Sequence, residues 1–194
     1  MYRGTDPSDV PRPSQRLVAG GGMIGVARLS REGRMGARAE ALAKQFEAKV
    51  QEATDVFEKL SEADWKKVTS AEKWPVCVVA HHIASAHEII SGIAKTVASG
   101  QPGPNIKMDD LHAMNAKHAQ DHASCTKAET LALHRKSAAA AAALVRGLDD
   151  KDLDRSGTVI NGAPPMTAAQ LAGGLLVGHI DEHLGSIRAT VGAK

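Results

Sequence analysis

Aromatic residues are scarce in this chain: two Trp, two Phe and one Tyr make up 3% of its 194 residues, whereas 43% are hydrophobic. A large core must therefore be built from aliphatic side chains and alanine. The strands of β-sandwiches usually draw on aromatic and β-branched residues instead. The composition therefore favours a bundle of helices.

Cysteine is also rare, and long apolar runs are missing. Cys77 and Cys125 have no companion cysteine at metal-binding or redox spacing, so we expect two free thiols in a cytoplasmic protein. The longest uninterrupted apolar run, residues 138–145, is far shorter than the roughly 20 residues that cross a bilayer. The sequence therefore predicts no membrane-spanning segment.

Neither sign of charge dominates. The chain has 24 Lys and Arg against 22 Asp and Glu, a formal charge of +2, and the two signs are interspersed. Nucleic-acid-binding proteins usually gather basic residues into a patch or a stripe. The sequence therefore predicts neither a nucleic-acid partner nor a surface for an acidic protein.

Residues 1–36 differ from the rest of the chain. They contain three prolines and the triplet Gly20–Gly22, with no sustained helical or strand period. Glycine interrupts the weakly apolar stretch that a secretory signal would need. We expect a flexible N-terminal extension, or a start site assigned too far upstream of Met23 or Met35, followed by one domain over residues 37–194.

Four segments show the 3.6-residue period of amphipathic helices, over about residues 37–60, 75–98, 126–145 and 168–191. Capping-box patterns open the last two, at Thr126 with Glu129 and at Thr167 with Gln170. Residues 105–125 predict a short helix in a long connection, and residues 157–162 a brief hairpin that turns at Asn161-Gly162. The pattern predicts an all-α four-helix bundle with one long crossover.

Two histidines in the last helix, His179 and His183, stand four residues apart among inward-facing aliphatic positions. Side chains at this spacing lie one above the other on a helix, which is a geometry that chelates metals. Buried imidazoles need partners for their ring nitrogens. The pair is therefore either two core histidines bonded to polar neighbours or part of a metal site.

His82 lies on the inner stripe of the helix over residues 75–98, facing the same core. Together with His179 and His183 it would supply three nitrogens from two helices, which leaves one coordination position open for water or a thiolate. His81 is turned about 100° away and is expected to be solvated. The same expectation holds for three histidines of the crossover segment, His112, His118 and His122.

Other polar residues near these histidines are weaker candidates. Asp181 and Glu182 point outward by their helical phase, which argues against either as a general base. Arg188 either anchors a substrate carboxylate or pairs with an acidic surface residue, and the second interpretation is favoured. Cys77 has the wrong phase for a ligand and is expected to be a small buried side chain.

Two short signatures together resemble the DinB-like superfamily. Trp74 is followed eight residues later by His82-Ile83, and the chain ends with His179-x-x-x-His183-x-Gly185-x-Ile187-Arg188. The resemblance covers about residues 38–192. It implies a four-helix bundle in which His82, His179 and His183 hold a divalent ion, usually zinc or nickel, and it implies frequent homodimers.

The superfamily includes mycothiol-dependent maleylpyruvate isomerases and bacillithiol S-transferases, so the resemblance implies a metal-dependent transferase or isomerase acting on a small thiol and an electrophile. Whether this chain turns over a substrate stays open. The alternatives are a non-catalytic, stress-associated metal-binding bundle and a helical module that acts through its surface. Position 87 is often acidic in such proteins but is histidine here, which leaves the surroundings of the triad open.

Overall fold

The computed structural model describes residues 36–192, so the predicted extension lies outside the described residues except for Gly36. Four long helices form a bundle, which confirms the predicted all-α class. They are α2 (Ala37–Lys59), α4 (Val76–Ala98), α6 (Lys127–Arg146) and α7 (Leu176–Val191). The first three begin and end within two residues of the predicted bounds.

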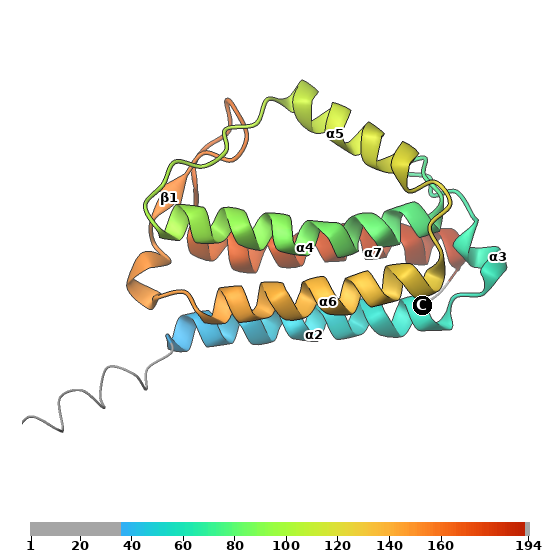
Figure 1. Cartoon of the computed structure of the whole chain (residues 1–194), viewed down its shortest axis with the longest axis horizontal. Coiled ribbons are helices and arrows are strands. Elements are labelled where there is room, and N and C mark those ends of the chain that lie inside the picture. The colour runs from blue at the N-terminus through green and yellow to red at the C-terminus, as the bar shows by residue number, and fades with distance from the viewer. Residues whose placement is uncertain (1–35, 193–194) are drawn as a thin grey trace, which may run out of the picture. The chain divides into compact units, whose positions relative to one another are not determined.

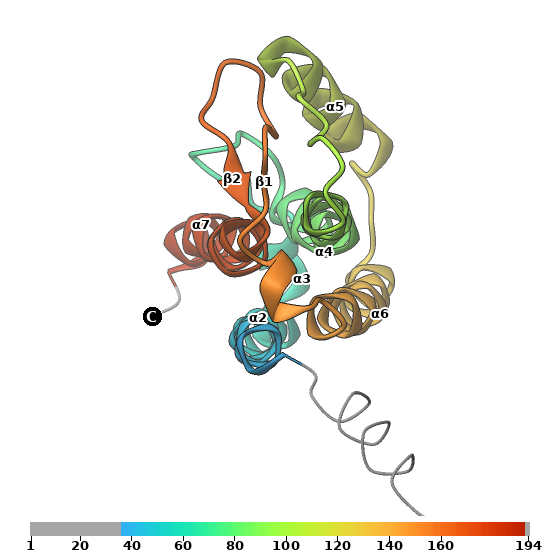
Figure 2. The same ribbon diagram turned by 90° about the vertical axis from the view of Figure 1, so that its left-hand side faces the viewer.

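The helices form a square in cross-section, with α4 and α7 in one layer and α2 and α6 in the other (Figure 2). α2 and α7 run in one direction, and α4 and α6 run in the opposite one (Figure 1). Because α4 and α6 are parallel neighbours, no tight turn can join them. The chain returns along the bundle through the crossover helix α5 (Met108–Asp121), as predicted.

The core is aliphatic, with three aromatic side chains, Phe46, Phe57 and Trp65, buried in it. The alanine run of α6 contributes one face only: Ala138, Ala141 and Ala142 are buried and the three alanines between and after them are exposed. Alanine favours the helix and lets neighbouring backbones approach closely. The alanine run is therefore part of a packed helix and not a low-complexity linker.

Both predicted capping boxes are present. The Glu129 amide donates to Thr126 Oγ1 (3.2 Å), and the Glu129 carboxylate accepts from the Thr126 amide (3.2 Å). Gln170 and Thr167 exchange the same pair of bonds. A third box, which the sequence analysis did not identify, opens the short helix α3 (Glu62–Trp65).

The hairpin is longer than predicted. β1 (Ser156–Gly157) pairs in antiparallel fashion with β2 (Met166–Thr167), so the connection spans residues 158–165 rather than turning directly at Asn161-Gly162. Residues 158–161 instead bond the start of the crossover: the Ile106 amide donates to the Val159 carbonyl (2.8 Å). A Cβ at Gly103 would collide with the Thr158 backbone, so this contact requires glycine.

The last helix begins at Ala168, as predicted, but it is not α-helical throughout. Gln170–Leu175 form a π-helix, η2, and the α-helix α7 follows from Leu176. Gly173 and Gly174, both weak helix formers, lie in this segment. The π-helical turn shifts the helical phase, and the fully buried stripe of α7 consists of Leu176, Val177, Ile180, Leu184 and Ile187.

α4 is long and apolar enough, by length and composition, to count as a candidate membrane span among the described residues. Most of its residues are buried against α6, α7 and η2. Central helices of packed bundles pass the same test. Its position in the core therefore accounts for its hydropathy.

Candidate metal centre

The three predicted ligands come together between α4 and α7. His82 lies in the second turn of α4, and His179 and His183 lie in the first half of α7, at the edge of its buried stripe rather than in the stripe as predicted. His82 Nε2 is 3.1 Å from His179 Nε2. One ring nitrogen from each of the three lies within 4.8 Å of the others.

These distances fit a divalent ion. Two zinc–nitrogen bonds of about 2.0–2.1 Å at a tetrahedral angle hold their nitrogens about 3.3 Å apart. A direct hydrogen bond between the two Nε2 atoms engages only one of the two lone pairs, whereas an ion between them accepts both. The donor set, three imidazoles, suits zinc, nickel and copper.

Glu72 supports the site from behind. Its Oε1 accepts a hydrogen bond from His183 Nδ1 (2.8 Å), and its Oε2 accepts one from Ser186 Oγ (2.6 Å). A proton fixed on Nδ1 leaves the Nε2 lone pair of His183 free for an ion. The sequence analysis missed Glu72, because it lies in the connection before α4, where no periodic pattern marks it.

The charge of Glu72 depends on its hydrogen bonds. Burial by itself raises the pKa of this carboxyl, but hydrogen bonds from Ser186, Thr69 and His183 together lower the pKa below its ordinary value. Glu72 is therefore ionised at neutral pH. A buried anion behind a ligand offsets the charge that a divalent cation brings into the bundle.

Trp74 and burial keep the two facing imidazoles in place and neutral. The Trp74 ring meets that of His82 edge-on, with centroids 5.5 Å apart. Burial, and next the nearby His179 and His183, lower the pKa of His82 to about 3. Burial and His183 lower the pKa of His179 to about 3 as well. Neutral imidazole is the form that binds metals.

His87 occupies the position that the sequence analysis left open. It is fully buried in α4. Its Nδ1 donates a hydrogen bond to Ser137 Oγ (3.2 Å), and this hydroxyl donates in turn to the Ala84 carbonyl. Its ring lies 5.0 Å from that of His134, which the sequence analysis did not single out. Each ring keeps one buried nitrogen that has no hydrogen-bond partner among residues 36–192. Both are core histidines, and neither belongs to the triad.

The predictions for the crossover histidines were partly wrong. His112 is exposed as expected, but His81, His118 and His122 are half-buried against one another. His81 Nδ1 lies 3.4 Å from His118 Nε2, and the His81 ring stacks on that of His122. The C-terminal turn of α5 returns to the first turns of α4, a long-range contact that helical phase cannot reveal.

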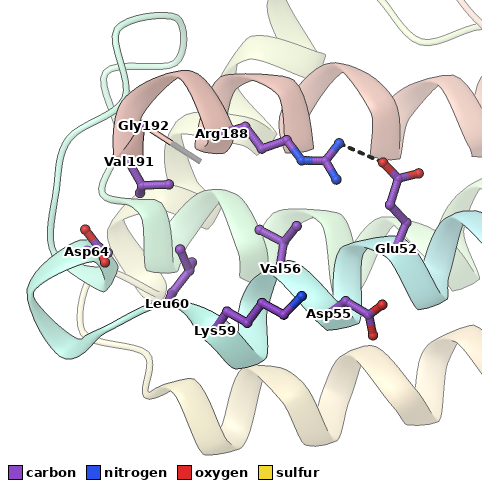
Figure 3. A pocket seen from close by; sticks show the side chains of 9 residues that line it. All are labelled: Glu52, Asp55, Val56, Lys59, Leu60, Asp64, Arg188, Val191 and Gly192. Atoms are coloured by element: carbon purple, nitrogen blue, oxygen red, sulfur yellow. Dashed lines mark hydrogen bonds and ion pairs between the residues drawn. The ribbon is translucent and has the colours of Figure 1, made fainter. Parts of the chain in front are cut away.

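The remaining candidates lie away from the triad. Asp181 and Glu182 are exposed, as predicted. Arg188 donates to Glu52 Oε1 (2.7 Å), which confirms the surface pairing. Both residues line a pocket of about 340 Å³ between α2 and α7 (Figure 3), and none of the three histidines borders it.

Both cysteines are free thiols, as expected. Cys77 is buried and Cys125 is half-buried, and Cys125 Sγ donates to the Cys77 carbonyl (3.2 Å). Burial raises the pKa of Cys125 to about 11, so this side chain is a thiol at neutral pH. Neither cysteine belongs to the centre.

Replacing Glu72 with glutamine should weaken zinc binding at the triad about 10- to 100-fold, because the carboxylate that orients His183 loses its charge. Competition titration against a chromophoric chelator measures the affinity. Glu52→Gln is the matched control. It removes the charge of a carboxylate that pairs with Arg188, which lies in α7 as His183 does, and it should not alter zinc affinity. Equal affinities for wild type and Glu72→Gln would contradict the supporting role of Glu72.

Comparisons with known proteins agree with this architecture. A solved structure described as the mycothiol-dependent maleylpyruvate isomerase superposes with a TM-score of 0.62 at 10% identity, covering 77% of this chain and 60% of that one. YfiT from Bacillus subtilis, described as a probable metal-dependent hydrolase with an unusual four-helix bundle topology, superposes with a TM-score of 0.57 at 18% identity. This second match covers 91% of this chain and 95% of YfiT.

At these identities the superpositions establish the fold alone, and the chain spans only 60% of the isomerase. No curated protein sequence matches the chain. The sequence profile of the DinB superfamily, however, matches residues 45–187, which include α4 and α6 completely, most of α2 and α7, and all three histidines. On that match, and with the bundle that goes with it, this chain belongs to the DinB superfamily.

Proposed function

We propose that this protein is a metal-dependent enzyme whose centre, His82, His179 and His183, holds zinc or nickel and activates a small thiol or water. The 3.1 Å approach of His82 Nε2 to His179 Nε2 is the observation that supports the proposal most, because two nitrogens that bind one zinc ion lie at about this separation. Three protein ligands leave a position for a reactant, as catalytic rather than structural sites do.

Such an ion, when bound, lowers the pKa of a coordinated thiol or water and so supplies a nucleophile at neutral pH. The residues of this chain prepare the place. Glu72 orients His183 and balances charge, and Trp74 packs against His82. His183 has a side-chain exposure of 14%, so the protein excludes most solvent from this ligand without sealing it off completely.

A thiol is the preferred reactant in this proposal. One structural relative is named as mycothiol-dependent, and both cysteines of this chain lie outside the centre, so the thiol must come from a small molecule. Its thiolate would attack an electrophilic carbon and form a C–S bond. In a transferase this attack displaces a leaving group, whereas in an isomerase the thiolate adds to a double bond and leaves again once the substrate has changed its geometry. Water activation is the second form, supported by the description of YfiT as a probable hydrolase. A metal-binding bundle without turnover is the alternative.

Assays of untagged protein loaded with zinc or nickel test the proposal. We expect faster conjugation of monochlorobimane with mycothiol or bacillithiol than with glutathione, and loss of the enhancement after chelation. Ester hydrolysis without any thiol reports the water-activating form. A metal-loaded protein inactive with all three thiols and with esters would contradict the enzymatic proposal and favour the non-catalytic bundle.

The proposal also includes a homodimer in the cytoplasm. Two free thiols suit a reducing compartment, and no charge pattern favours nucleic acid. Sedimentation equilibrium of the untagged chain measures the mass of the assembly. A monomer at micromolar concentration would contradict the dimer and leave the metal centre unaffected, because all three ligands come from one chain.

A further inference from the structure

A second group of three histidines lies beside the first. His81 comes from α4, and His118 and His122 stand four residues apart at the end of α5, so one helix supplies a single imidazole and the other a pair. The triad of the proposed centre has the same division between α4 and α7. A chelating pair plus one imidazole from a facing helix is a metal-binding arrangement.

The rings of this second group converge. One nitrogen from each lies within 4.8 Å of the others, and His81 Nδ1 is 3.4 Å from His118 Nε2. The His81 and His122 rings stack with centroids 3.8 Å apart, and those of His118 and His122 are 4.6 Å apart. Apart from the 3.4 Å contact, no hydrogen bond of the described residues engages these rings. Most of the ring nitrogens in this group are therefore not engaged by other side chains, which leaves their lone pairs available to an ion.

The position of α5 gives a second, independent reason. None of its 14 residues is buried, and Met108 and Met114 are exposed. Both views show α5 running beside the bundle and apart from the packed square (Figures 1 and 2). A helix without buried apolar residues gains little from hydrophobic packing. The histidine group lies where α5 reaches α4, so it is placed to fasten this helix.

Negative charge is available nearby. The carboxylate of Glu129, at the start of α6, acts on His81 through its charge. The carboxylate of Asp121 acts in the same way on His118, although it also pairs with Lys117 (2.7 Å). The His118 ring also lies 5.2 Å from that of His82, so the two histidine groups are neighbours. Two cations held close together in one protein need such carboxylates to limit their repulsion.

We propose that His81, His118 and His122 form a second site for a divalent transition metal of the kind that imidazole prefers, zinc, copper or nickel, which fastens α5 to α4 beside the first centre. Bound there, the ion joins the crossover to the bundle. The end of α5 then covers His82 from the side of His118. This site goes beyond the proposed function and does not depend on it, because it shares no ligand with the first centre.

Zinc titration of the untagged, metal-free full chain tests the second site. We expect two equivalents for wild type and one for His122→Ala, measured by calorimetry and by metal content after desalting. His112→Ala is the matched control, because His112 is exposed on the same helix and outside the group, and it should keep two. His118→Ala is a second test variant, and circular dichroism establishes that each variant is folded.

Hydrogen exchange of α5 gives a readout that metal content alone does not. Zinc should slow amide exchange over residues 108–121 in wild type and His112→Ala, and should not do so in His122→Ala. Equal zinc content in wild type, His122→Ala and His118→Ala would overturn the proposal. If wild type binds one equivalent, which His179→Ala keeps and His122→Ala loses, the first centre fails and the second site stands.

Discussion

Replacing His179 with alanine should abolish retention of a metal ion at the centre, where only His82 and His183 would remain as ligands. His179 lies closest to His82 and forms the i, i+4 pair with His183, so its removal breaks both relationships at once. Loss of a supporting group behind a ligand costs 10- to 100-fold in metal affinity. We expect loss of a ligand itself to cost more.

The same substitution should change stability, because an ion that binds only the folded state stabilises it. At a free zinc concentration of 100 times Kd, one site adds about 2.7 kcal/mol to the free energy of unfolding. For a domain of this size that corresponds to about 5–10 °C in Tm. The contribution of this centre should be absent in His179→Ala.

Metal content after desalting and thermal unfolding with and without zinc measure the two effects. His112→Ala, which removes an exposed histidine, should match wild type in both. In the presence of a chelator, His179→Ala should lose little stability, since the substitution also removes a buried nitrogen for which the described part of the chain offers no hydrogen-bond partner. Equal zinc content and equal zinc-induced shifts in wild type and His179→Ala would refute the centre.

Acid should destabilise the metal-free protein through His87. Burial, and next the neighbouring His134, lower the pKa of His87 to about 3, whereas a histidine in an unfolded chain titrates near pH 6.5. Above about pH 6.5 both states are neutral and His87 makes no pH-dependent contribution. Below that value His87 binds a proton in the unfolded state but not in the folded state, so the free energy of unfolding falls until the pH nears 3.

The expected size follows from proton linkage. One such histidine removes about 1.4 kcal/mol per pH unit, or on the order of 2 kcal/mol between about pH 6.5 and pH 5. Burial also lowers the pKa of His134, which adds to the loss. Urea unfolding at a series of pH values, with a chelator present, measures the free energy at each pH.

His87→Gln isolates the contribution of one side chain. Glutamine does not titrate, and its amide can donate to Ser137 Oγ as the imidazole does. The free energy of unfolding of the variant should fall less steeply with acid than that of wild type. His112→Gln, at an exposed site, should follow wild type. Parallel curves for wild type and His87→Gln would contradict the assignment of a buried neutral histidine at position 87.

The four helices and the convergence of three histidines could be predicted because their signals are local. Helical period marks the segments, and the Thr126 and Thr167 capping boxes mark two starts to within a residue or two. His179 and His183 share a face because they are four residues apart. Phase also places His82 toward the same core, and the superfamily resemblance adds the pairing between helices.

What could not be predicted depends on contacts distant in sequence or on deviations from regular geometry. Glu72 lies in an irregular connection, and its role arises only when α7 brings His183 against it. The grouping of His81 with His118 depends on the path of the crossover. The π-helical turn before Leu176 is invisible to a 3.6-residue period, which is why the stripe of α7 was misplaced.

The route of the chain also divides the centre into two segments. His82 precedes the crossover, whereas His179 and His183 follow it, and α5 contributes no buried residue to the core. A chain cut early in α5 would yield two helical hairpin-like fragments, one with a single imidazole of the centre and the other with a pair. All three histidines could then bind one ion only if the two fragments reassociated. Metal binding by the mixed fragments would therefore measure how well they assemble.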